Sequence, residues 1–228
     1  VGGVIEKPVI KGEIQARGPG CALYAFDDNR QPVVDSLGEM VITKPMPSMP
    51  VFFWNDPGKK KYHSSYFEDI PGVWRHGDWV RITHDGGIVI YGRSDATLNR
   101  QGIRIGTAEI YRVLNEIPEI EDGLIVNLEL EGGRHYMPLF VKLRNGLVLD
   151  KDLIATIARA LKSKCSPRHV PDEVIQVTDI PYTISGKKME APVKKILMGM
   201  EADSALNKDA MRNPESLQFF KLFEVPQE

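Results

Sequence analysis

The chain has 228 residues, of which 42% are hydrophobic, and a formal net charge of −2. This length and composition fit a folded protein of one large or two small domains. The balanced charge argues against a nucleic-acid or anionic-membrane partner, and no apolar run is long enough to span a bilayer. No signal peptide is visible, and Cys21 and Cys165 are isolated thiols without metal-ligand spacing, which predicts a reducing, cytoplasmic setting.

The first 94 residues have the pattern of short β-strands. Brief apolar runs separated by glycine, proline and aspartate turns predict strands at 13–17, 22–26, 38–43, 79–83 and 87–91. Asp85-Gly86 lies between the last two runs and is a hairpin signal. Several short strands with close turns predict a β-barrel-like portion or a folded sheet.

After Asn99 the pattern becomes mixed, and we expect an α+β domain. A helix is predicted at 107–114, with a capping box at Thr107 and Glu109. Further elements are expected as a hairpin of 124–130 with 136–143, helices at 150–164, 190–200 and 216–223, and a strand at 173–177. The fold class is therefore α+β, divided into residues 1–94, rich in β-structure, and residues 95–228, a compact second domain.

The segment Ile180–Glu190 predicts an exposed lysine at the tip of a turn. Pro181 and Gly186 bracket the turn, and Lys187 follows the glycine. A lysine in this position is a mobile cation that can reach a phosphate or a developing carboxylate–phosphate bond. The ordinary alternative is a solvated surface loop.

Two residues near the predicted domain boundary could contact a ribose. Asp78, after Gly77, can accept two hydroxyl hydrogen bonds, or it can be a common turn aspartate. Arg93 follows a strand and a glycine, and could bond ribose or phosphate oxygens or form a surface ion pair with Asp95.

Two further cations are candidates for phosphate binding. Arg104 lies between Gly102 and Gly106, which would let a ligand approach the backbone, although the same residues suit an ordinary β-turn. The glycine spacing is not that of a dinucleotide-binding loop. Lys162 ends a predicted helix, where a cation complements the helix dipole whether or not it binds a ligand.

Three motifs in this order resemble the carboxyl-terminal part of the adenylate-forming superfamily. They are Tyr91–Asn99, Gly102–Gly106 and Ile180–Glu190. The superfamily includes acyl-CoA synthetases, firefly luciferase and the adenylation domains of peptide synthetases. The resemblance implies that residues 1–94 end a large adenylation domain and that residues 95–228 form its small mobile domain and a tail.

The resemblance also implies a role for each candidate residue. Asp78 and Arg93 would contact the adenosine ribose, and Asp95 would be the hinge about which the small domain rotates. Arg104 would contact the adenylate phosphate.

The remaining roles concern the coenzyme and the adenylation step. Gly102 would line the tunnel for the pantetheine of coenzyme A, and Lys162 would bind a phosphate of that coenzyme. Lys187 would be the adenylation lysine. Tyr182 stands where many members have lysine, a departure that should not harm the turn.

Within the superfamily the closer resemblance is to the acetoacetyl-CoA synthetase group. It is carried by Lys11–Arg17, Phe53–Asp56, Tyr66–Trp74, Arg168–Pro171, Ile180–Thr183 and Asn213–Leu217. The resemblance implies an AMP-forming acid–thiol ligase that uses ATP, coenzyme A and a small carboxylate, acetoacetate. Mg²⁺ would accompany ATP, with no metal ligand in this chain. The alternatives are a synthetase for acetate, propionate or another short acyl chain, a folded but inactive module, and an enzyme that passes its acyl group to a carrier protein.

Several superfamily motifs are missing from this chain. The phosphate loop, the adenine and metal motif and the acyl pocket would all lie upstream of Val1, which is not a methionine. We therefore expect a fragment that makes no acyl-adenylate by itself. Without its upstream region it should expose an apolar patch around Phe52, Phe53 and Trp54.

Overall fold

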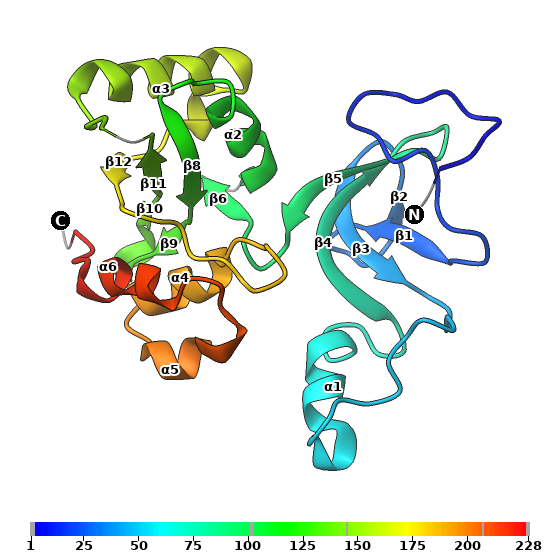
Figure 1. The fold of residues 1–228 in the computed structure, drawn as a ribbon. Helices are drawn as coiled ribbons and strands as arrows, with labels where there is room; N and C mark the ends of the chain where they lie inside the picture. The colour runs from blue at the N-terminus through cyan, green and yellow to red at the C-terminus, as the bar shows by residue number, and fades with distance from the viewer. Residues whose placement is uncertain (1–2, 101–102, 145, 207, 227–228) are drawn as a thin grey trace. The chain divides into compact units, whose positions relative to one another are not determined.

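A computed structural model describes residues 3–100, 103–144, 146–206 and 208–226. The chain separates into two compact units, with the division between Asp95 and Ala96 (Figure 1). No helix within the described ranges is long and apolar enough to cross a membrane. Cys21 and Cys165 are both free thiols.

The first unit is built on an antiparallel sheet of strand order β2-β1-β3-β4-β5. The strands are β1 (Leu23–Phe26), β2 (Pro32–Val33), β3 (Leu37–Ile42), β4 (Trp74–Ile82) and β5 (Ile88–Arg93). Over the described residues this sheet is open, with β2 and β5 at its edges, so the expected barrel-like closure is not confirmed. The hairpin around Asp85-Gly86 is confirmed as the β4–β5 pair.

The predicted strand at 13–17 is wrong. Ile14 makes only an isolated bridge to Ile88, although the two residues exchange both backbone hydrogen bonds at 2.8 Å. The Gln15 side chain accepts from Val4 N and donates to Lys7 O, so it holds the preceding loop in place. The polar side chain competes with the backbone here and favours a loop over a strand.

An aromatic cluster, which the strand pattern did not predict, packs beside β4. Its helix is α1 (Lys60–Tyr66), preceded by a 3₁₀ turn at Pro57–Lys59. Tyr66 stacks on Trp74 with ring centroids 4.0 Å apart, and Tyr62 contacts Tyr66 edge to face. Aromatic pairs of this geometry contribute beyond their buried area. By contrast Trp54 is 93% exposed and Phe52 is also exposed, whereas Phe53 packs on Tyr62.

The second unit is built on a three-stranded sheet, β12-β11-β8, with helices on both faces, and it also holds the two-stranded pairs β6-β7 and β10-β9. The strands of the unit are β6 (Leu98–Arg100), β7 (Ile103–Ile105), β8 (Ile120–Ile125), β9 (Leu128–Glu129), β10 (His135–Tyr136), β11 (Pro138–Leu143) and β12 (Glu173–Gln176). Its helices are α2 (Thr107–Leu114), α3 (Lys151–Lys164), α4 (Glu190–Leu197), α5 (Ala202–Ala205) and α6 (Leu217–Leu222). Short 3₁₀ turns cover Glu131–Gly133, Pro167–His169, Lys208–Ala210 and Pro214–Ser216. The predicted hairpin is confirmed, with β8 antiparallel to β11 and the short β9–β10 pair beyond.

Alternation along the strands gives the sheet of the second unit two buried faces. Leu139 faces a core that contains residues of α2 and α3, whereas its neighbour Phe140 faces α4 and α6. Leu124 and Ile125 on β8 divide between the same two cores. Successive side chains of a strand point to opposite faces, so one apolar run supplies both cores.

The first residues of α2 and α3 show which of the capping signals in the sequence are used in the structure. Asp150 caps α3 by accepting from Leu153 N at 2.8 Å, and α2 begins at Thr107 as predicted. The capping box is wrong, because Thr107 is already helical and the cap residue is Gly106, which has no side chain to accept a bond. Glu109 instead bonds His169 Nε2 at 3.0 Å.

Candidate functional site

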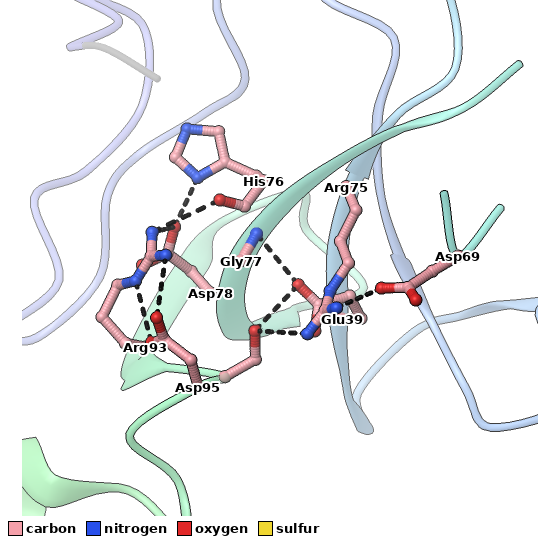
Figure 2. Close-up of polar contacts among 9 residues, drawn as sticks. Glu39, Asp69, Arg75, His76, Gly77, Asp78, Arg93 and Asp95 are labelled. Carbon is pink, nitrogen blue, oxygen red and sulfur yellow. Dashed lines mark hydrogen bonds and ion pairs between the residues drawn. The ribbon is translucent and has the colours of Figure 1, made fainter. Parts of the chain in front are cut away.

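Asp78 and Arg93 meet because they are partners across β4 and β5 (Figure 2). One Arg93 guanidinium nitrogen lies 3.9 Å from an Asp78 oxygen, and His76 contacts the same carboxylate. Arg93 also donates two hydrogen bonds, at 3.2 and 3.4 Å, to the carboxylate of Asp95. The three predicted residues of the first unit are therefore brought together. Asp78 is 16% exposed and Arg93 is half exposed, so a ligand can reach the arginine.

Gly77 allows this close approach. Its φ is +86°, and a Cβ built there would lie 2.8 Å from Arg93 Nη2. Register shifts in both neighbouring strand pairs, β3–β4 and β4–β5, fall in this part of the sheet. Bulges of this kind are common next to functional sites because they redirect side chains.

Glu39 organises the backbone behind these residues. Its carboxylate accepts from Gly77 N at 3.0 Å and from Ser94 Oγ at 3.3 Å, and it pairs with Arg75 at 3.5 Å (Figure 2). Burial raises the pKa of the Glu39 carboxyl, against the opposing effect of Arg75 and the hydrogen bonds. Sequence reasoning missed Glu39. The available signal was a single charged residue within the apolar strand Leu37–Ile42.

A hollow of about 460 Å³ adjoins this cluster within the first unit. It is lined by the Tyr66–Trp74 pair, Gly77, Arg93 and their neighbours. Aromatic faces, guanidinium donors and a carboxylate suit a small polar ligand such as a nucleoside. Asp78 is not among the residues that line this hollow.

Lys187 sits at the exposed end of a tight turn in the second unit. Gly186 has φ +79° and donates from its N–H to Thr183 O at 2.9 Å. Thr183 N donates to Lys187 O at 2.9 Å, and Lys187 N donates to Thr183 Oγ1 at 3.0 Å. Among the described residues no side chain or carbonyl pairs with the Lys187 ammonium.

The adjacent Lys188 is bound to the rest of its unit. Its ammonium lies 2.6 Å from Asp122 Oδ1, donates to Gly123 O at 2.6 Å, and lies 3.9 Å from the centre of the Tyr111 ring. The Tyr111 hydroxyl donates to Glu190 at 2.8 Å. Burial, and then the Glu190 charge, raise the pKa of Tyr111 well above its ordinary value.

Tyr182 extends this network. Its hydroxyl donates to the second oxygen of Asp122 at 2.6 Å, and it pairs with Lys188 across the turn. Burial and then Asp122 raise the pKa of Tyr182 above its ordinary value. Both residues that flank the turn are therefore fixed by the Asp122 carboxylate. Sequence reasoning did not identify either Lys188 or Asp122 as an anchor.

The remaining candidates lie apart from the turn in sequence. Arg104 is on β7, where it is the partner of Asn99, and Gly102 lies outside the described residues. Lys162 is exposed in the last turn of α3.

No group of three or more metal-ligating side chains that could hold an ion occurs among the residues described. The donor set therefore does not fit a metal centre, and we assign no metal ligand to this chain.

Comparison with known proteins gives close relatives for nearly the whole chain. It is 43% identical to acetoacetyl-CoA synthetase of Rattus norvegicus and 45% identical to acetoacetyl-coenzyme A synthetase of Rhizobium meliloti, each over 94% of this chain. Among solved structures, acetoacetyl-CoA synthetase from Streptomyces lividans matches 92% of the chain with 48% identity and a TM-score of 0.87. The chain is homologous to the carboxyl-terminal part of acetoacetyl-CoA synthetases.

The limits of this homology are also clear. The chain spans about a third of the length of the curated relatives, 32% of each, and 31% of the Streptomyces lividans chain. An anthranilate CoA ligase in complex with anthranoyl-AMP shares the fold at 20% identity, with a TM-score of 0.68. No family model matches the chain. The fold is thus that of adenylate-forming enzymes, and the acetoacetyl-CoA synthetases are its relatives in sequence.

The raised pKa of Glu39 predicts a pH-dependent effect of Glu39→Gln on the stability of this acetoacetyl-CoA synthetase homologue. A folded-state pKa above the ordinary 4.5 favours the protonated form, so this stabilisation is present below 4.5 and is lost as the pH rises through the folded pKa. Glutamine stays neutral, so the variant should gain stability relative to wild type as the pH rises above 4.5 and through the raised folded-state pKa of Glu39. All three tryptophans lie in the first unit, so fluorescence-detected urea unfolding reports this unit. A stability difference that is constant or falls with pH would contradict the prediction.

The two lysines of the turn should differ in their effect on stability. Lys188→Met leaves Asp122 without its cation and should lower the free energy of unfolding of the second unit by about 2 kcal/mol. Lys187→Met removes an exposed charge and should change it by less than about 0.5 kcal/mol. Circular dichroism in urea, corrected for the first-unit transition seen by fluorescence, measures both. Equal effects would show that Lys188 is not an anchor.

Proposed function

We propose that this chain is the carboxyl-terminal part of an AMP-forming acyl-CoA synthetase whose acid substrate is acetoacetate. The observation that carries the proposal is 41–45% identity to acetoacetyl-CoA synthetases over nearly all of the chain. It is supported by Lys187, an exposed lysine in a hydrogen-bonded turn whose ammonium pairs with none of the described residues. An assay of the full-length enzyme for pyrophosphate release with a panel of carboxylates tests it. Acetoacetate should be preferred over acetate and propionate.

The proposed reaction has two steps. A carboxylate oxygen attacks the α-phosphorus of ATP, which forms an acyl-adenylate and releases pyrophosphate. The thiol of coenzyme A then attacks the acyl carbonyl carbon, and AMP leaves with the bonding electrons. The carboxylate is a weak nucleophile, so the first step depends on positioning and on stabilising charge at the phosphate.

Lys187 is the residue of this chain that we assign to the first step. Its ammonium is exposed and unpaired by any described residue, and the turn that carries it is closed by its own hydrogen bonds. A cation held in this way loses little on meeting an anionic phosphate and stabilises developing charge there. Lys188 is excluded from this role because its ammonium already binds Asp122 and Gly123 O.

Asp78 and Arg93 are the residues that we assign to the ribose of the nucleotide. The carboxylate can accept ribose hydroxyls, and the half-exposed guanidinium can donate to ribose or phosphate oxygens. Support comes from the hollow beside Arg93 and from the paired position of the two residues across β4 and β5. Arg104 would contact the adenylate phosphate. Gly102 and Lys162 would contact coenzyme A.

We further propose that residues 1–94 end the large adenylation domain and that residues 95–228 are the small mobile domain. In support, the division into compact units falls between Asp95 and Ala96. Asp95 would then be the hinge, and its bidentate contact with Arg93 would hold one orientation. Mg²⁺ would accompany ATP on ligands upstream of this chain. The free thiols agree with a cytoplasmic location.

Because the chain spans 32% of its relatives, we expect it to form no acyl-adenylate alone. The phosphate loop and acyl pocket are not among its motifs. Binding energy that positions the reactants would then be missing, and such positioning supplies much of the rate. The exposed Val51, Phe52 and Trp54 agree with a surface that the upstream region covers.

Lys187→Ala in the full-length protein should block adenylation and spare the thioester step. Loss of one charge stabiliser should slow acetoacetate-dependent ATP–pyrophosphate exchange by about two to three decades, whereas thioester formation from supplied acyl-adenylate stays near normal. Lys195→Ala removes another exposed lysine of the same unit and serves as the control. Equal losses in the two half-reactions would refute the role of Lys187.

Asp95→Pro should separate the two half-reactions if Asp95 is a hinge. Proline fixes φ, and it should trap one orientation of the small domain and slow one half-reaction about tenfold more than the other. Asp95→Asn keeps backbone freedom and an acceptor for Arg93, so it should leave the ratio of the two rates unchanged. Near-normal rates in Asp95→Pro would make Asp95 an ordinary linker residue.

A further inference from the structure

Residues 210–212, beyond α4, lie antiparallel along the lysine turn and are joined to it by an isolated β-bridge. Ile184 N donates to Ala210 O at 2.9 Å, and Arg212 N donates to Tyr182 O at 3.0 Å. Thr183 and Met211 are antiparallel partners between these two bonds. The segment therefore pairs with the arm of the turn that leads to Lys187.

Asn213 joins this segment to the base of the turn. It is 7% exposed, and its Oδ1 accepts from Tyr182 N at 2.9 Å. Its amide nitrogen donates to Ile180 O at 2.8 Å and to the carboxylate of Asp179. One buried side chain thus satisfies two backbone groups before the turn, which would be costly to leave unpaired.

Asn213 is itself held from the carboxyl-terminal side. Ser216 Oγ donates to Asn213 O at 2.7 Å, and α6 follows directly. Phe220 of α6 is buried against Phe140 of β11, with ring centroids 4.9 Å apart. The chain of contacts runs from the central sheet through α6 and Asn213 to the lysine turn, and Figure 1 shows α6 beside α4.

We propose that Asn213, together with the bridged segment 210–212, positions Lys187. The inference rests on the proposed role of Lys187 and extends it to a part of the chain that has no other assigned role. A single β-turn closed by a few hydrogen bonds is marginally stable by itself, and the bridge to segment 210–212 adds two backbone hydrogen bonds that restrain it. A charge stabiliser loses effect when it is misplaced, and an error of about 1 Å can cost about 100-fold in rate.

The test compares two buried asparagines in the full-length protein. Asn213→Ala should speed hydrogen exchange of amides 182–188 and slow acetoacetate-dependent ATP–pyrophosphate exchange between about tenfold and about 100-fold. Thioester formation from supplied acyl-adenylate should stay within about twofold, because that step does not use Lys187. Asn127→Ala is the matched control. Asn127 is 2% exposed in the same unit, and its amide contacts His135 rather than the lysine turn.

The thermal midpoint of each variant separates positioning from general destabilisation. Equal decreases in the rates of both half-reactions, together with a lower thermal midpoint, would overturn the proposal. Faster hydrogen exchange of amides 182–188 with a normal adenylation rate would also overturn it. If Asn213→Ala does not fold, Ser216→Ala is the second variant, because it removes the hydrogen bond from Ser216 Oγ to Asn213 O. It should slow adenylation by a smaller factor and leave the thioester step unchanged. Normal adenylation in Lys187→Ala would instead overturn the proposed function, so the two failures are distinguishable.

Discussion

The structure of the lysine turn depends on the contacts of one partly buried ammonium group, that of Lys188. This group lies between Asp122, Gly123 O and the face of Tyr111, where a cation gains from a charge, a carbonyl and a ring at once. Adjacent side chains of an extended segment point to opposite sides, so fixing Lys188 inward directs Lys187 outward. Two neighbouring lysines therefore have opposite roles, one as an anchor and one as an exposed cation.

The first unit uses charge differently, because its charged groups are paired at partly exposed positions. Arg93 has Asp78 and Asp95 as partners, and Glu39 has Arg75 behind it. Partly exposed ion pairs contribute little stability, so their value lies in holding geometry. The partly buried Glu39 fixes Gly77 N and Ser94, and Gly77 leaves room for the guanidinium. The arginine is thus oriented and still accessible, which a ligand-binding group requires.

The elements that the sequence predicted best are those with local signals. Helix 107–114 follows from its apolar periodicity, and the β4–β5 hairpin follows from Asp85-Gly86. The failures have tertiary causes. At 13–17 only a bridge forms, and the Gln15 side chain bonds the preceding loop. The capping box fails because Gly106 is the cap residue of α2, and Glu109 contacts His169 instead. Lys187 could be selected from its turn, but Asp122, Tyr111 and Asn213 bond to residues at or beside the turn that are 31 or more positions away, so they have no local signature.

A rigid lysine turn is compatible with a domain movement during the reaction if the whole second unit moves together. The turn is closed by Thr183, flanked by Lys188 and bridged to residues 210–212, so independent motion of Lys187 would break several hydrogen bonds. Rotation of the whole unit about the division after Asp95 would cost less than moving the turn alone, because a hinge confines the change in backbone angles to a few residues. A preorganised cation that moves as part of a rigid body meets its phosphate without a further ordering cost. Under the proposed function, the fixed geometry of the turn that carries Lys187 is therefore what allows movement of the small domain to bring this lysine to the phosphate and to withdraw it.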